Sequence, residues 1–230
     1  MRIGFRRMAV RWAAFVGGSL GALQVGAGAE RLYAPFSEYA MSQESEIALA
    51  RSAAPGAVSM HASIEVLTPG GYEVAVKGDG DFVCMVLRGW SAAPEPVATR
   101  SAKIRGPACF DSVAARTVVP AEELKARLGL AGKSPEEIGQ QVTAQYKLGK
   151  LPKMEGAGFA YMWSASQQVG SRAAVWHPHM MVYVPYYENR FLGNNPVGSH
   201  TAPFVVGDGT PYSIVMIAVD DRLAIGVGGR

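Results

Sequence analysis

Residues 82–87 read Phe-Val-Cys-Met-Val-Leu, and this run decides the fold. An unbroken apolar run of this length is typical of a strand in the interior of a sheet, with both faces covered. Residues 72–76 form a second strand pattern, and the linker at 77–81, Lys-Gly-Asp-Gly-Asp, contains residues that tolerate positive φ. We therefore expect residues 72–76 and 82–87 to pair as a hairpin. Residues 63–67 form another strand, which Pro-Gly-Gly at 69–71 ends.

Helix signals lie on both sides of these strands. Ser42 can cap a helix over residues 42–53, where Glu44 and Glu46 lie near its positive end. A second helix is expected over 120–128. A third follows Ser134, where Ser-Pro-Glu-Glu contains a capping box.

The last third of the chain returns to strand patterns. The expected strands there are residues 159–163, 174–184, 204–206, 213–219 and 223–227, whereas residues 91–107 are loop-like. The order of helix, strands, helices and strands favours an α+β domain with a mainly antiparallel sheet and a few short flanking helices. The strand-helix alternation of a doubly wound parallel sheet is missing.

The chain contains two cysteines, Cys84 and Cys109. An even count in an exported protein indicates a disulfide. By the chain-entropy model, closing the loop between the two cysteines with a disulfide would stabilise the folded protein by about 3 kcal/mol. A nucleophilic or redox pair is the alternative, but the spacing is not Cys-x-x-Cys.

The first 29 residues have the pattern of a signal peptide. Four arginines and no acid precede or flank an apolar stretch, and Ala-Gly-Ala at 27–29 fits the small-x-small rule for cleavage. The apolar stretch is short for a membrane span, although an uncleaved anchor remains the alternative. We expect an exported, periplasmic protein whose single domain covers residues 30–230.

Removal of the signal peptide changes the charge of the protein. The whole chain has a formal charge of +3, and taking away its four N-terminal arginines leaves −1. No basic cluster remains that would bind nucleic acid. No second long apolar run predicts a membrane span. About 200 residues remain, enough for one domain with a full core.

Two of the four histidines, His177 and His179, lie in the run Trp-His-Pro-His-Met-Met-Val-Tyr-Val-Pro at 176–185. Because side chains alternate along a strand, both imidazoles should point to one face, opposite an apolar face that packs on the core. Pro178 lacks an N–H donor and favours a sheet edge or bulge. Two imidazoles on one face can chelate a divalent ion.

A third ligand would have to come from elsewhere in the chain. His200 is the leading candidate because it follows this strand in a polar loop, and the other options are His61, Glu188 and Asp208. Three protein ligands and a water would make a catalytic zinc geometry. Met181 on the same face favours copper instead.

Three functions therefore stay open. The first is the binding of a divalent metal or another small ligand around His177, His179 and His200. The second is a metal-dependent or histidine-based hydrolase that uses the same residues. The third is a structural or interaction module in which these histidines are ordinary polar residues, because His-Pro-His sets no spacing to a third ligand. The sequence contains no Gly-x-Ser-x-Gly elbow.

Several short runs are together similar to a group of uncharacterised exported bacterial proteins with no known activity. These runs are residues 46–55, 75–78, 82–84, 105–110, 161–164 and 177–180. The resemblance covers most of the chain after residue 29. It implies a single exported domain and brings no activity, cofactor or catalytic residue with it.

Overall fold

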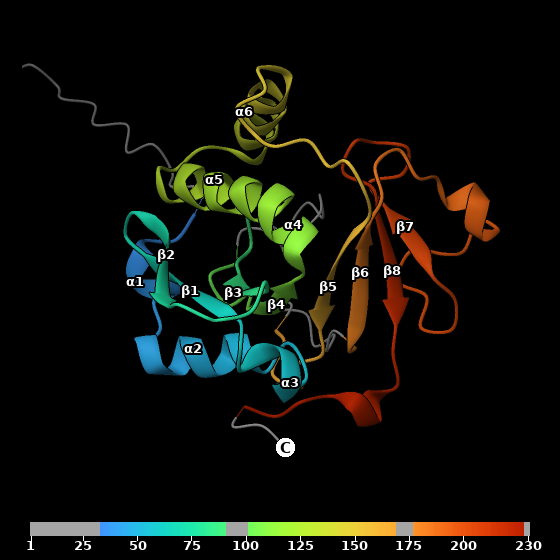
Figure 1. The fold of residues 1–230 in the computed structure, drawn as a ribbon. Coiled ribbons are helices and arrows are strands. Elements are labelled where there is room, and N and C mark those ends of the chain that lie inside the picture. The colour runs from blue at the N-terminus through green and yellow to red at the C-terminus, as the bar shows by residue number, and fades with distance from the viewer. Residues whose placement is uncertain (1–32, 91–100, 169–176, 228–230) are drawn as a thin grey trace, which may run out of the picture. The chain divides into compact units, whose positions relative to one another are not determined.

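The computed structural model describes residues 33–90, 101–168 and 177–227, so the signal peptide expected at 1–29 lies outside the described residues. Within these ranges eight strands form one sheet in the order β2-β1-β3-β4-β5-β6-β8-β7 (Figure 1). All neighbours pair antiparallel except β1 and β3, which are parallel. The predicted α+β fold with a mainly antiparallel sheet is confirmed.

The strands are β1 (Ser63–Thr68), β2 (Gly71–Val76), β3 (Val83–Leu87), β4 (Gly106–Phe110), β5 (Gly158–Met162), β6 (His179–Tyr183), β7 (Phe204–Val206) and β8 (Ile214–Ala218). The α-helices are α1 (Phe36–Tyr39), α2 (Gln43–Arg51), α3 (Gly56–Ser59), α4 (Ser112–Thr117), α5 (Val119–Leu130) and α6 (Pro135–Lys147). Two 3-10 helices, η2 (Asn189–Leu192) and η3 (Asp221–Leu223), lie in the last part of the described chain.

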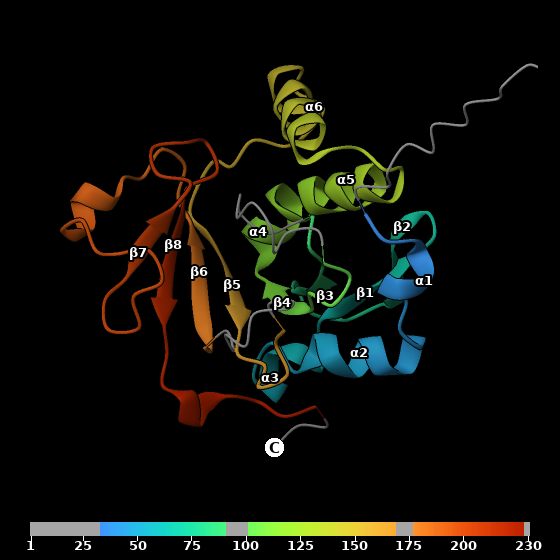
Figure 2. The ribbon, with the colours of Figure 1, turned by 180° about the vertical axis from the view of Figure 1, so that it is seen from behind.

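Helices cover both faces of the sheet at β1, β3 and β4. Figures 1 and 2 show α2 on one side of these strands, and α4 and α5 on the other. Helix α6 packs on α5. Two separate apolar clusters result, one beneath α2 and a larger one beneath α4, α5 and α6.

Strand β3 lies between these two clusters. Cys84 and Val86 point to the α2 side and Met85 to the α5 side, and all three are fully buried. The prediction that residues 82–87 lie in the interior of the sheet is confirmed. The unbroken apolar run follows from having a helix layer on each face.

The predicted disulfide between Cys84 and Cys109 is present. The two residues lie directly opposite each other on β3 and β4, with their Cα atoms 4.0 Å apart. The expectation that residues 91–107 form a loop was wrong at its end, because β4 begins at Gly106 and includes Pro107. Residues 91–100 lie outside the described residues.

The predicted hairpin of residues 72–76 with 82–87 was wrong. Strand β2 pairs with β1 across the turn at residues 69–70, and β3 lies on the other side of β1, parallel to it. The Gly-Asp run at 77–81 is therefore a crossover between non-adjacent strands. Gly78 passes so close to the backbone that a Cβ would lie 2.2 Å from the carbonyl oxygen of His61. The glycine serves this close approach rather than a hairpin turn.

Helices α2 and α6 begin where their capping signals predict. The Ser42 hydroxyl accepts a hydrogen bond from the Ser45 N–H at the start of α2. At α6 the capping box of Ser134 and Glu137 is complete, with distances of 3.1 and 2.8 Å. The strand expected at 223–227 was wrong, because η3 occupies Asp221–Leu223 and a single bridge pairs Ile225 with Ser164.

A fully buried ion pair fixes α2 on the sheet. The Arg88 guanidinium, just after β3, lies 2.7 Å from the Glu46 carboxylate of α2, and the two side chains are 0% and 1% exposed. The same carboxylate oxygen accepts a hydrogen bond from the N–H of Leu67 at 3.2 Å. Arg88 also donates to the carbonyl of Val86. The pair thus ties together α2, β1 and β3.

We expect Arg88→Met to destabilise the protein by about 3–5 kcal/mol, because the Glu46 carboxylate would stay buried without a partner. The double variant Glu46→Leu, Arg88→Met should recover part of this loss. Urea unfolding measures the free energy of unfolding of each. Arg116→Met, at an exposed position on α4, is the matched control and should change stability by less than about 0.5 kcal/mol. A single variant as stable as this control would contradict the role of the pair.

A second buried carboxyl, Glu65 on β1, has a different environment. It is 7% exposed, and its Oε2 atom has no hydrogen-bond partner within the described residues. Burial, with the nearby Glu123 of α5 as a second cause, raises the pKa of Glu65 from 4.5 to about 7. The folded protein therefore holds a proton on Glu65 that the unfolded chain releases at lower pH.

A raised carboxyl pKa contributes stability below the unfolded-state pKa, and this contribution is lost as the pH rises through the folded-state value. Glu65→Gln should therefore be more stable than the wild type above pH 7, by on the order of 3 kcal/mol, with the difference disappearing near pH 4.5. Thermal unfolding between these pH values measures this, with the exposed Glu155→Gln as control. A stability difference that does not depend on pH would contradict the assignment.

Candidate functional site

Strand β6, which carries His179, lies inside the sheet. It pairs antiparallel with β5 on one side and with β8 on the other. The expectation of a sheet edge at Pro178 was wrong, since this residue stands just before the strand, and its carbonyl still accepts a hydrogen bond from the Val219 N–H at 2.9 Å. A proline is tolerated there because no donor is required of it.

The two faces of β6 are the reverse of those predicted. His179, Met181 and Tyr183 are buried, and the last two join the cluster beneath α4, α5 and α6. Met180 and Val182 on the other face are only half-buried. Both faces of this strand are largely apolar, so the alternation by itself does not identify the core side.

His179 is therefore buried, whereas the side chain of His177, just before the strand, is 40% exposed. His179 is 7% exposed, and its Nδ1 atom lies 2.7 Å from the carbonyl oxygen of His177, so Nδ1 carries the proton and donates. Burial lowers the pKa of His179, because a buried imidazole disfavours the charged form. Met181 is buried as well, and its sulfur accepts from the Tyr183 hydroxyl at 3.6 Å.

His177 and His200 are brought together. Their ring centroids lie 4.1 Å apart, and the two ring planes are inclined at 59°. His177 stands just before β6, and its side chain is 40% exposed. His200 comes from the loop between η2 and β7. The loop therefore brings His200 to His177, as the sequence suggested. His179 is not part of this pair.

A carboxylate outside the predicted ligand set completes this group. Asp221, the first residue of η3, has its Oδ1 atom 2.8 Å from Nδ1 of His177. The three side chains border a hollow of about 270 Å³ whose other lining residues are Ala218, Val219 and Asp220. Asp220 pairs with Arg222 through its carboxylate. In the sequence, Asp221 is marked only by the acidic run Asp-Asp-Arg at 220–222. Its contact with His177 could not be predicted from that run, because it depends on the pairing of β6 with β8.

The other candidate ligands are engaged elsewhere. His61 pairs with Asp79 at 2.8 Å in the crossover between β2 and β3. Glu188 pairs with Arg190 at 2.6 Å, and Asp208 accepts a hydrogen bond from the Asn189 main chain. Across the described ranges, no three His, Cys, Asp or Glu side chains cluster in a way that could hold a metal ion. Any ion at His177 and His200 would therefore bind through two imidazoles.

Comparisons with protein-family models, with curated proteins and with solved structures found no match to this chain. The resemblance of its short runs to exported bacterial proteins thus stays a prediction. No helix in the described part of the chain is long and apolar enough to cross a membrane.

Proposed function

We propose that this is an exported protein that binds a divalent transition-metal ion through His177 and His200. The observation that carries the proposal is the pair of imidazoles 4.1 Å apart beside a hollow, one of them held by Asp221. Imidazole is a ligand for zinc, copper and nickel. At metal–nitrogen distances of about 2.0–2.1 Å, two ligand nitrogens on one ion lie roughly 3 Å apart, which adjacent rings can reach by small rotations.

Asp221 has a defined part in this proposal. The Asp221 carboxylate can only accept a hydrogen bond, so Nδ1 of His177 donates its hydrogen and the lone pair of the neutral ring is on Nε2. Metal-bound histidines commonly have such a carboxylate on the other ring nitrogen, which orients the ring and increases its basicity. Nε2 of His177 is then the atom that faces an ion, and water fills the remaining positions.

The Asp221–His177 pair is also the one observation that favours a histidine-based hydrolase, because a carboxylate orients the general base in such enzymes. A hydrolase of this kind further needs a nucleophile beside the imidazole. In the ranges that the structure covers, no serine, threonine or cysteine side chain is hydrogen-bonded to His177 or His200. Binding therefore agrees better with the geometry than catalysis does.

The disulfide supports export to an oxidising compartment such as the periplasm. Cys84 and Cys109 are both fully buried and bonded to each other. Structural disulfides form and persist mainly outside the cytoplasm. An exported protein with surface imidazoles also meets metal ions without competition from cytoplasmic thiols.

Titration of the purified protein with Zn²⁺ and Cu²⁺ in a calorimeter tests the proposal. His177→Ala and His200→Ala should each weaken binding by more than about ten-fold, and Asp221→Asn by about ten-fold, because each removes a ligand or its orientation. His61→Ala is the matched control, since His61 is also an exposed histidine paired with an aspartate. Metal binding that survives the loss of both His177 and His200 would sink the proposal, as would the absence of binding to the wild type, which would favour an interaction module.

A further inference from the structure

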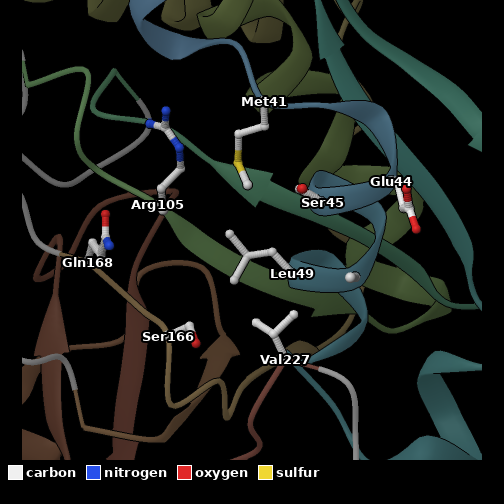
Figure 3. A pocket seen from close by; sticks show the side chains of 9 residues that line it. Met41, Glu44, Ser45, Leu49, Arg105, Ser166, Gln168 and Val227 are labelled. Carbon is white, nitrogen blue, oxygen red and sulfur yellow. The ribbon is translucent and has the colours of Figure 1, made fainter.

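A second hollow, of about 650 Å³, lies along α2. This volume is within the range of about 300–1,000 Å³ that is usual for small-molecule sites. Parts of the chain far apart in sequence line it (Figure 3). The lining residues are Met41, Glu44, Ser45, Ala48, Leu49, Arg105, Ser166, Gln168 and Val227.

Hydrogen bonds join the walls of this hollow to each other. After α2, the Ser52 hydroxyl lies 2.7 Å from that of Ser164, in the loop that follows β5. The same loop pairs with the C-terminal segment, where the Ala165 N–H donates to the Ile225 carbonyl at 2.8 Å. Three walls are therefore held in place without a ligand, and a preformed site loses less entropy on binding.

Arg105 fixes the remaining wall. Its main chain pairs with that of Gln168 through two hydrogen bonds of 3.1 and 2.9 Å. Its guanidinium donates to four main-chain carbonyls, those of Glu38, Tyr39, Ala102 and Ile104. The side chain thereby ties the end of α1, just before Met41, to the start of β4.

The charge of Arg105 is not neutralised by these contacts. All four acceptors are neutral carbonyls, and no carboxylate of the described residues pairs with this half-buried side chain. Burial, together with the positive charge of Arg88, lowers the pKa of Arg105 to about 10. The Nε–H donor has no partner within the same residues. A half-buried cation without a counter-ion favours an anionic group beside it.

The opposite side of the hollow carries a negative charge. Figure 3 shows Arg105 and Gln168 on one side and Glu44 on the other, with the apolar side chains of Met41 and Leu49 between them. Glu44 is exposed and has no hydrogen-bonded or ionic partner in the described ranges. Across the lining of the hollow, the Arg105 side chain is thus followed by the apolar side chains of Met41 and Leu49, and then by Glu44.

We propose that this hollow binds a small zwitterion with an apolar body, namely an apolar amino acid or a short peptide with free termini. The ligand carboxylate lies toward Arg105 and the Gln168 amide, and its ammonium group toward Glu44. The apolar side chain packs on Met41 and Leu49. Opposite charges at the two ends select zwitterions over molecules that carry one charge, because either half alone leaves one protein charge uncompensated.

Calorimetric titration with L-leucine, dileucine and trileucine tests the ligand class and identifies the preferred length. The two single-charge analogues are 4-methylpentanoate, which lacks the ammonium group, and isoamylamine, which lacks the carboxylate. The best zwitterion should bind at least about ten-fold more tightly than either analogue. Equal binding of one analogue would overturn the proposal, as would the absence of saturable binding of every zwitterion at about 10 mM.

Two variants locate the binding to this hollow. Ala48→Phe should fill it and abolish leucine or peptide binding, whereas Ala144→Phe, at an exposed position on α6, should leave binding unchanged. Glu44→Gln should weaken binding by about ten-fold, and Glu155→Gln should not. Loss of the Arg105 side chain would also release α1, so a variant at this position would not separate ligand binding from folding. Zwitterion binding that persists unchanged in Ala48→Phe would overturn the assignment.

Discussion

The enclosed ion pair between Glu46 and Arg88 is the interaction on which the arrangement of the N-terminal half depends. Both charges are out of contact with water, and each is costly to bury alone, so α2 cannot move away from the sheet without exposing or separating them. The Leu67 N–H shares the Glu46 carboxylate, which fixes the helix relative to β1 as well as β3. Helix α2 forms one wall of the hollow, so the buried ion pair as well as apolar packing sets the position of this wall.

The disulfide acts on the same face of the sheet. Cys84 and Cys109 join the neighbouring strands β3 and β4 beneath α2, among residues that include Leu49 and Ala50. Leu49 both packs in this cluster and lines the hollow. The covalent link, the ion pair and the floor of the hollow are thus parts of one rigid layer. Such a layer gives the polar groups at its rim a fixed support.

Local features of this chain could be read from the sequence, and long-range pairings could not. The capping box at Ser134 and the interior position of residues 82–87 depend only on neighbouring residues, and both were predicted. The choice of partner for β2 depends on which of two glycine-containing turns closes a hairpin, and both were plausible. The face of β6 was misjudged because both of its faces are apolar. Glu46 was interpreted as a residue favoured by the helix dipole, since Arg88 lies far along the chain.

The histidine site depends on strand register in the same way. In the β6–β8 pairing, His179 is opposite Ala218, which brings the residues before β6 alongside those after β8. A shift of one residue would turn every side chain of β6 to the other face and take His177 away from Asp221. His200 arrives through a loop that contains left-handed backbone at Gly193, Asn194 and Gly198. The sequence indicated His177 and His200, but their contact with Asp221 is set by strand register and loop shape, so no short sequence spacing predicts it. The same reasoning explains why its third predicted member, His179, lies in the core.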